Sequence, residues 1–267
     1  MRKAMVVLSG GQDSTTCLYW AKYNFDEVHA VTFDYNQKHD REIEAAKKIA
    51  QMAGVASHEV VELGPILKGR SPLTNPDESL ETYSSYDEMS DIIGERVELT
   101  FVPMRNALFL TIAANRAVCK DIYNLVTGVC EADNANYPDC RSVFIDEQQR
   151  TIQYALGLDK MNVSGTYNPN RFDIYTPLIN KTKAESVKLA MTFPGCYEAL
   201  AYSHTAYSGE YPPKTQDHAT VLRAEGFREA GVPDPLIVRA HQETGFPLPD
   251  TPNYYGIREE LKQGVNL

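Results

Sequence analysis

Strand-like and helix-like stretches alternate along the first two thirds of this 267-residue chain. Short apolar runs indicate buried strands, and longer stretches with apolar residues at helical spacing indicate helices. The alternation predicts an α/β fold with a doubly wound, mostly parallel sheet and helices on both faces. Strands are expected at residues 6–8, 28–35, 57–63, 122–129 and 172–178, and helices at 14–24, 41–54, 105–118, 144–158 and 182–191.

Two stretches depart from this alternation. Residues 64–96 are rich in Pro, Ser, Asp and Tyr and are poorly periodic, so we expect an exposed excursion from an α/β domain that spans residues 1–194. Residues 195–267 are expected to form a loop-rich C-terminal segment. Its Pro-rich part, after Gly231, is expected to pack on the body or on a partner chain.

Composition limits the function classes. A hydrophobic fraction of 43% indicates a globular chain, and no stretch is apolar enough to span a bilayer or to act as a cleaved leader, so a cytoplasmic enzyme without a membrane partner is expected. The five cysteines form no C-x-x-C pair, which favours buried thiols in a reducing compartment. A net charge of −10 argues against direct nucleic-acid binding and favours a small, partly anionic substrate.

The turn after the first strand is the most specific local feature, within "VVLSGGQDSTTCL" at residues 6–18. A strand-to-helix turn directs free N–H groups and the positive end of a helix dipole at one point, which suits a phosphate. Neither a Walker loop nor a dinucleotide fingerprint matches, because the required Lys and the third glycine are missing. The candidate contacts are two glycines and the neighbouring hydroxyls: Ser9, Gly10, Gly11, Ser14, Thr15 and Thr16.

Asp13 is the unusual member of this turn. A carboxylate beside phosphates repels them unless a cation such as Mg²⁺ lies between, so Asp13 is a candidate Mg²⁺ ligand. The alternative is an ordinary turn in which Asp13 or Ser14 only caps the helix.

Other polar and aromatic residues follow the predicted strands or precede the helix at 105. Since ligands of an open parallel sheet bind outside the carboxyl ends of its strands, these residues predict a site on one rim. Each also has a structural interpretation: Asp34 suits a turn, Arg105 suits an ion pair, and "YPDC" suits a β-turn. The set is Asp34, Tyr35, Gln37, His39, Arg105, Asn106, Asp133, Tyr137, Asp139 and Arg141.

"LSGGQDS" resembles the pyrophosphate loop of the N-type ATP pyrophosphatases, which activate a carbonyl or carboxylate oxygen with AMP and release pyrophosphate. Within that superfamily the chain resembles the 7-cyano-7-deazaguanine synthase family. The resemblance runs from residue 4 to about residue 190 and rests on "SGGQDSTTCL", "TFDYNQKHDREIEAA", "TFVPMRNALFL", "GVCEADNANYPDCR" and "TPLINKTKAE". "YPDCR" beside "FVPxRN" separates this family from other pyrophosphatases.

The resemblance implies an adenine nucleotide alpha hydrolase-like fold and a nucleotide site. Asp13 would hold Mg²⁺, Lys183 would neutralise charge on the phosphates, and Arg105 would bind the substrate carboxylate or the α-phosphate. The implied nucleotide residues are Leu8, Ser9, Gly10, Gly11, Gln12, Asp13, Ser14, Thr15, Phe33 and Gly128.

A substrate pocket is implied as well. Asp133 and Asp139 would accept hydrogen bonds from a deazaguanine, and Tyr137 would stack on it or wall it. Lys183 as a solvated helix charge and Asp139 as a turn residue are the structural alternatives. The implied substrate residues are Tyr35, Gln37, Arg105, Asn106, Asp133, Tyr137 and Asp139.

The family's reaction turns 7-carboxy-7-deazaguanine and ammonia into the nitrile, through an adenylated carboxylate, an amide and an adenylated amide, in queuosine biosynthesis. The resemblance therefore implies ATP and Mg²⁺ as cofactors, ammonia arriving free because no amidase half is present, and a homodimer.

A C-terminal departure concerns metal. The family is expected to carry a four-cysteine zinc site before an "LR..GF" helix, and "AYSGEYPPKTQDHATVLRAEGF" at 206–227 matches that frame. Ala206, Lys214, Asp217 and Thr220 stand in the cysteine places and cannot form a thiolate site, so no zinc ligands are expected. The nearby groups that could in principle bind a metal are Cys196, His204, Asp217 and His218, whose spacing follows no known structural site.

Milder departures are Gln12 in place of Leu or Val, and Asn36 and Met104 in place of Gly. Two alternatives to the nitrile-forming reaction remain. One is an adenylating enzyme that stops at the amide or uses another acceptor, and the other is a catalytically silent nucleotide-binding protein. The destination of the product, whether transfer RNA, DNA or a small metabolite, stays open.

Overall fold

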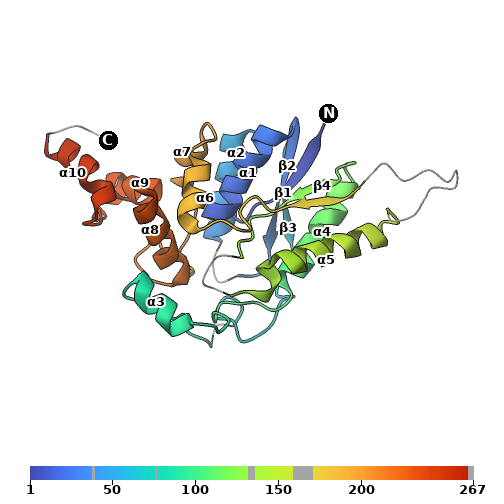
Figure 1. Ribbon diagram of the computed structural model, residues 1–267, viewed down its shortest axis with the longest axis horizontal. Coiled ribbons are helices and arrows are strands. Elements are labelled where there is room, and N and C mark those ends of the chain that lie inside the picture. The colour runs from blue at the N-terminus through green and yellow to red at the C-terminus, as the bar shows by residue number, and fades with distance from the viewer. Residues whose placement is uncertain (38–39, 76, 132–135, 159–170, 264–267) are drawn as a thin grey trace.

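The computed structural model describes residues 1–37, 40–75, 77–131, 136–158 and 171–263. In these ranges five strands form one sheet in the order β3-β2-β1-β4-β5, and every neighbouring pair is parallel (Figure 1). The strands are β1 (Lys3–Val7), β2 (Glu27–Asp34), β3 (Ser57–Glu62), β4 (Asn124–Val126) and β5 (Asp173–Tyr175). The predicted parallel, doubly wound sheet is confirmed, with β4 and β5 shorter than expected.

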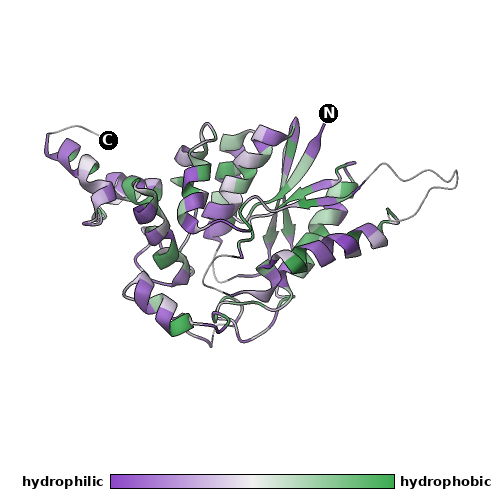
Figure 2. Cartoon of the chain, in the orientation of Figure 1, coloured by the Kyte–Doolittle hydropathy of each residue, from purple (hydrophilic) through white to green (hydrophobic). Residues whose placement is uncertain are grey.

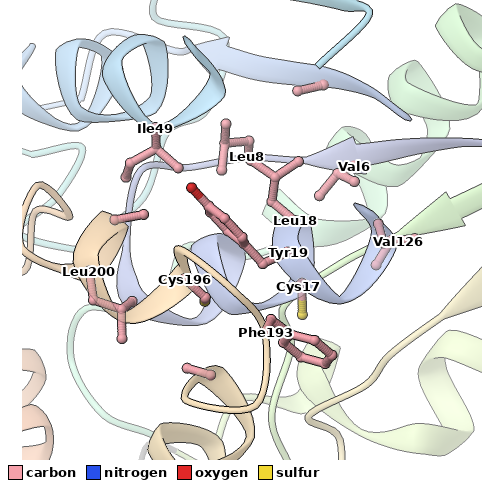
Figure 3. Packing of buried hydrophobic residues seen from close by; sticks show 14 of the residues in the cluster. Val6, Leu8, Cys17, Leu18, Tyr19, Ile49, Val126, Phe193, Cys196 and Leu200 are labelled. Carbon is pink, nitrogen blue, oxygen red and sulfur yellow. The ribbon is translucent and has the colours of Figure 1, made fainter. Parts of the chain in front are cut away.

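Helices cover both faces of the sheet. One layer contains α1 (Gln12–Asn24), α2 (Arg41–Ala53), α6 (Lys183–Ala190) and α7 (Cys196–Leu200), and the other contains α4 (Arg105–Val118) and α5 (Ser142–Ala155) (Figure 1). Each layer closes its own buried apolar core. Figure 3 shows the first, in which Leu18 and Ile49 lie between the strands and α7. The second core packs α4 and α5 around Leu125 and Phe172.

Hydropathy follows this layering. Hydrophobic and hydrophilic residues alternate along the helices, and the strands carry both colours (Figure 2). Burial on both faces explains the apolar runs of the strands, since a parallel sheet has no solvent face. Among the described residues, no helix is long and apolar enough to cross a membrane.

The excursion is only partly exposed. It contains a helix, α3 (Tyr86–Ile93), whose N-cap Ser85 accepts a hydrogen bond from Glu88 N. Tyr83, Met89 and Ile93 are buried against Val221 and Leu222 of α8 (His218–Ala230). The excursion therefore joins the C-terminal segment instead of standing free.

The C-terminal segment is less loop-rich than predicted. Besides α7 and α8 it contains α9 (Pro235–Thr244) and α10 (Tyr255–Lys262), and a 3₁₀ turn at Pro252–Tyr254. Asp217 and Asp234 cap the starts of α8 and α9, while Gly231 and Gly245 end these helices in the left-handed conformation. These capping residues are typical helix boundaries, and they divide the segment into short helices joined by loops.

Candidate active site

The turn between β1 and α1 is held by two close backbone approaches. Gly10 has a φ of +87°, and a Cβ there would collide with the Glu42 carbonyl oxygen of α2. A Cβ on Gly128, just after β4, would lie 2.9 Å from the Asp13 carbonyl carbon and the Ser14 nitrogen. Glycine at both positions allows the start of α1 to pack closely between α2 and the end of β4. This position is at the reversal of strand order, where such sheets bind ligands.

The hydroxyls of the turn divide into two groups. Ser9 Oγ and Ser14 Oγ lie 3.0 Å apart, and Ser9 Oγ accepts a hydrogen bond from Gly11 N at 3.3 Å. Ser14 Oγ and Thr15 Oγ1 both donate to the Gly11 carbonyl, at 3.1 and 2.8 Å, so both stabilise the first turn of α1. Ser9 and Ser14 face the cavity described next, whereas Thr15 and Gly10 do not line it.

A cavity of about 320 Å³ opens beside this turn. Its volume suits a small-molecule ligand. Most of the predicted nucleotide and substrate residues line it, and they come from the ends of β1, β2 and β4, from the starts of α1, α4 and α6, and from the segment just before the 3₁₀ turn Pro138–Cys140. These residues are Leu8, Ser9, Gly11, Gln12, Asp13, Ser14, Phe33, Tyr35, Gln37, Arg105, Asn106, Tyr137, Gly128 and Lys183.

Asp13 and Lys183 meet at the part of the cavity beside the turn at residues 9–14, the predicted phosphate loop. Lys183 Nζ donates to Asp13 Oδ2 at 2.8 Å, and the lysine side chain is only 10% exposed. The lysine opens α6, whose start is fixed by a reciprocal capping box between Thr182 and Glu185. The capped start of α6 therefore places the Lys183 ammonium beside the Asp13 carboxylate at the start of α1.

Gln12 contributes an unusual polar group. Its side chain lines the cavity and the residue is 6% exposed, yet within the described part of the chain its Nε2 has no hydrogen-bond partner. A buried donor left without an acceptor costs about 1–3 kcal/mol, so an anionic ligand at this point would stabilise it.

Three tyrosines surround Arg105 at the other end of the cavity. Tyr35, Tyr137 and Tyr207 all lie close enough to the Arg105 guanidinium to interact electrostatically with it. Burial raises the pKa of all three phenols, so they are neutral at pH 7 and Arg105 supplies the positive charge of this group.

The position of Tyr137 is fixed from behind. Its hydroxyl donates to the Glu98 carboxylate at 3.1 Å and also contacts Thr100, and Glu98 is 2% exposed. The Phe101 ring lies 5.6 Å from the Tyr137 ring, centroid to centroid. The tyrosine ring is therefore an immobile wall of the cavity.

Asp139 does not line this cavity. It lies in the 3₁₀ turn Pro138–Cys140, where its Oδ2 accepts from Asn106 N at 3.2 Å while Asn106 Nδ2 donates to its carbonyl at 3.1 Å. Burial raises the pKa of this carboxyl, against the hydrogen bonds from Asn106. These contacts tie the turn to the start of α4, which is the structural role that the sequence left open.

The remaining predicted rim residues have other placements. Asp34 Oδ1 accepts from Asn36 N at 3.1 Å in a turn, and Arg141 Nε donates to the Pro138 carbonyl at 3.2 Å. Asp133 and His39 lie outside the described residues.

Sequence reasoning missed a group of cavity residues. Glu42 was assigned only to an amphipathic helix, although it belongs to the quoted stretch "TFDYNQKHDREIEAA". His204, Tyr207 and Arg223 follow no strand, so the rule that located the other residues could not find them. His204 N donates to the Gly10 carbonyl at 2.9 Å, which ties the C-terminal segment to the phosphate loop. The missed lining residues include Glu42, Leu73, His204, Thr205, Tyr207, His218, Leu222 and Arg223.

The places expected for zinc cysteines hold a hydrogen-bonded cluster. Asp217 is 1% exposed and accepts from Tyr207 N at 2.7 Å, from Thr220 N at 2.9 Å and from Thr220 Oγ1 at 3.0 Å. Ala206 beside it is fully buried. In the described ranges, no group of three His, Cys, Asp or Glu side chains is arranged to hold a metal ion.

The chain is similar to proteins of queuosine biosynthesis. The family model described as "Queuosine biosynthesis protein QueC" matches residues 3–231. A 7-cyano-7-deazaguanine synthase of Gloeobacter violaceus is 51% identical over 239 residues, covering 88% of this chain and 96% of the relative. One of Laribacter hongkongensis is 43% identical, with 88% and 94% covered.

Among solved structures, an NH3-dependent NAD synthetase from Campylobacter jejuni is similar over 76% of this chain and 69% of its own, at 13% identity and a TM-score of 0.38.

Proposed function

The chain belongs to the family of queuosine biosynthesis protein QueC, and we propose that it is an ATP-dependent 7-cyano-7-deazaguanine synthase. Its reaction would convert 7-carboxy-7-deazaguanine and ammonia to the nitrile. ATP would activate first the carboxylate oxygen and then the amide oxygen. The homodimer expected from the resemblance stays a prediction.

One observation carries the proposal: a single cavity has the phosphate loop at one end and Arg105 among three tyrosines at the other. The loop suits the phosphates of ATP, since N–H groups and the hydroxyls of Ser9 and Ser14 meet there. A guanidinium among neutral aromatic rings suits a planar aromatic carboxylate, because it binds the anion in bidentate fashion while the rings contact the base.

The two ends suit an adenylation. A carboxylate is unreactive toward ammonia because oxide is a poor leaving group, whereas AMP is a good one. Attack of the carboxylate on the α-phosphorus would release pyrophosphate, whose charge Lys183 is placed to stabilise. Arg105 would orient the carboxylate for that attack, so both cations would act by position and charge without forming covalent bonds.

We propose Asp13 as the protein ligand for Mg²⁺. Magnesium ions in such sites use one or two carboxylates together with substrate phosphates, so a single carboxylate beside a phosphate loop fits. The bound ion would supply charge neutralisation for the pyrophosphate. Asp13 would then exchange its contact with Lys183 for the ion, which leaves Lys183 free to reach the phosphates.

The experiment is an incubation of the protein with ATP, Mg²⁺, ammonium and 7-carboxy-7-deazaguanine, following AMP release and the mass of the deazaguanine product. We expect the nitrile, with AMP released for each adenylation, and loss of both in Asp13→Ala. Accumulating amide would mean an altered endpoint. Absence of substrate-dependent AMP release would overturn the proposal in favour of another acceptor or a silent nucleotide-binding protein.

A further inference from the structure

Glu42 lines the cavity between its two ends and has no part in the chemistry described above. It lies in the first turn of α2, and its carbonyl oxygen is packed against Gly10 of the phosphate loop. Its half-buried side chain keeps access to the cavity. The backbone contact fixes this carboxylate beside the loop, on the side where the acyl group must meet the nucleotide.

The charged and titratable groups around Glu42 come from three other elements. Arg105 faces it from the start of α4, Tyr35 from the end of β2 and Tyr207 from the C-terminal segment. Asp40 and Arg41 are its neighbours on its own helix. Burial raises the pKa of Glu42 to about 7, although the Arg105 guanidinium favours the ionised form. The carboxyl can thus take up and release a proton near neutral pH.

The reaction must remove protons from nitrogen. Ammonium has to lose one proton before its lone pair can attack the acyl carbon, and the resulting adduct loses a second. Converting the amide to the nitrile removes both protons of the amide nitrogen. Asp13 and Lys183 form an ion pair and would hold the phosphates, and Arg105 lies among tyrosines and would hold the substrate carboxylate. Neutral buried phenols are poor proton acceptors.

We propose that the Glu42 carboxylate is the general base of the nitrogen-transfer steps, acting on ammonium and then on the amide nitrogen. In the first step a proton passes from ammonium to Glu42 and on to water, the nitrogen lone pair forms the C–N bond, the adduct gives a second proton to Glu42, and the C–O bond breaks with its electron pair leaving on AMP. When the amide oxygen is adenylated, the nitrogen gives one proton to Glu42 and becomes a neutral imidate. In the last step the remaining imidate N–H proton passes to Glu42, the N–H electrons form the third C–N bond, and AMP leaves again. Water in the open cavity carries each proton away between steps.

This inference rests on the proposed function. Its geometric support is that Arg105 holds the carboxylate while the loop holds the phosphates, so the acyl carbon lies between them, where Glu42 is placed. The negative charge of an ionised Glu42 carboxylate would also attract ammonium into the cavity before the proton is transferred.

The test compares Glu42→Gln with Glu44→Gln, a matched change two positions away on the same helix at an exposed residue that pairs with Lys47. The substrate-dependent exchange of pyrophosphate into ATP reports adenylation, and amide and nitrile formation report nitrogen transfer. We expect Glu42→Gln to keep exchange within about tenfold but to lose amide formation by about 10²–10⁴-fold, while Glu44→Gln resembles the wild type.

Two further readouts separate a base from a residue that only supports Arg105. The rate of amide formation in the wild type should rise with pH through an inflection that Glu42→Gln lacks. Hydroxylamine, a weaker base than ammonia and so largely unprotonated at neutral pH, should give hydroxamate at similar rates in both proteins.

Equal ammonia-dependent rates in wild type and Glu42→Gln would overturn the inference, and so would a variant defect confined to the KM for the deazaguanine with an unchanged pH profile. If the wild type itself shows no substrate-dependent exchange, the proposed function fails. The two failures are therefore distinguishable.

Discussion

Two parts of the cavity lining, the phosphate-loop end and the C-terminal wall, are built in different ways. The phosphate-loop end is a contiguous stretch, Ser9 to Ser14, whose shape depends on local glycines and on one ion pair, Asp13 with Lys183. The C-terminal wall is the part of the lining formed by His204, Thr205, Tyr207, His218, Leu222 and Arg223. Buried side chains that make several hydrogen bonds join its separate segments. Arg223 donates to Asp234, Ser203, Thr205 and the Leu200 carbonyl. The contiguous loop can therefore keep its chemistry when residues of the C-terminal wall are replaced.

We expect the buried ion pair of the C-terminal wall to contribute far more to the free energy of unfolding than the ion pair of the loop does. Arg223 and Asp234 are 4% and 3% exposed, with Nε to Oδ2 at 2.6 Å. Arg223→Met would leave the Asp234 carboxylate buried without its partner, and we expect the free energy of unfolding to fall by about 3–5 kcal/mol, measured by guanidinium denaturation.

The control for this prediction is the double variant Arg223→Met, Asp234→Leu. It should recover most of the loss, except for about 1 kcal/mol from the missing cap of α9, since Asp234 also accepts from Leu236 N. A single variant as stable as the wild type would contradict the claim that this ion pair holds the wall.

The loop end should show the opposite behaviour. Lys183→Met removes the cation from the phosphates but leaves Asp13 25% exposed, where water can solvate it. We expect AMP release to slow by about 10²–10³-fold, with little change in the free energy of unfolding. The rate is measured at saturating ATP and deazaguanine.

Lys188→Met is the matched control, because Lys188 lies on the outer face of the same helix and is exposed. Equal rates in the two variants would show that Lys183 only completes the ion pair. A large loss of stability in Lys183→Met would remove the contrast between the two parts of the lining.

The same contrast explains which features the sequence could predict. The alternation of apolar periods located every strand and the helices α1, α2, α4, α5 and α6, because period and burial are encoded within each segment. The turn between β1 and α1 could also be located, since its glycines and hydroxyls are adjacent in the chain.

Contacts between distant segments were not readable. Nothing in the helix pattern around Glu42 distinguishes a surface acid from one facing a cavity, and Tyr207 reaches Arg105 only after the C-terminal segment has folded back. Asp139 had two interpretations from the sequence, as a ligand or as a turn residue. They could be separated only by the position of Asn106, which lies 33 residues earlier and supplies the hydrogen bonds.

A third prediction concerns the place where zinc cysteines were expected. Asp217 links Tyr207 to the start of α8 through three accepted hydrogen bonds. Asp217→Ala leaves two buried N–H groups without this acceptor, so we expect a loss of about 1–3 kcal/mol in the free energy of unfolding.

A chelator that strips zinc should leave the wild-type melting temperature unchanged, and Asp217→Asn, which keeps an acceptor oxygen, should lose less stability than Asp217→Ala. A melting temperature that falls with chelator and returns with zinc would contradict the idea that hydrogen bonds alone hold this cluster.

The smallest expected effect concerns Gln12 of the loop. There the KM for ATP and the free energy of unfolding are expected to change independently in one variant, which tests the difference between the loop and the C-terminal wall most directly. Gln12 keeps a buried Nε2 that has no acceptor within the described residues. Replacing it in Gln12→Leu removes that unpartnered donor, so the free energy of unfolding should stay constant or rise by about 1 kcal/mol. The KM for ATP should rise by about two- to tenfold, because one hydrogen bond to the phosphates is lost.

Gln12→Asn, which shortens the side chain but keeps the amide, should raise the KM for ATP without increasing the free energy of unfolding. A Gln12→Leu protein that is less stable and binds ATP as well as the wild type would place the amide in the packing of the loop, and the loop would then depend on its buried polar groups as the C-terminal wall does.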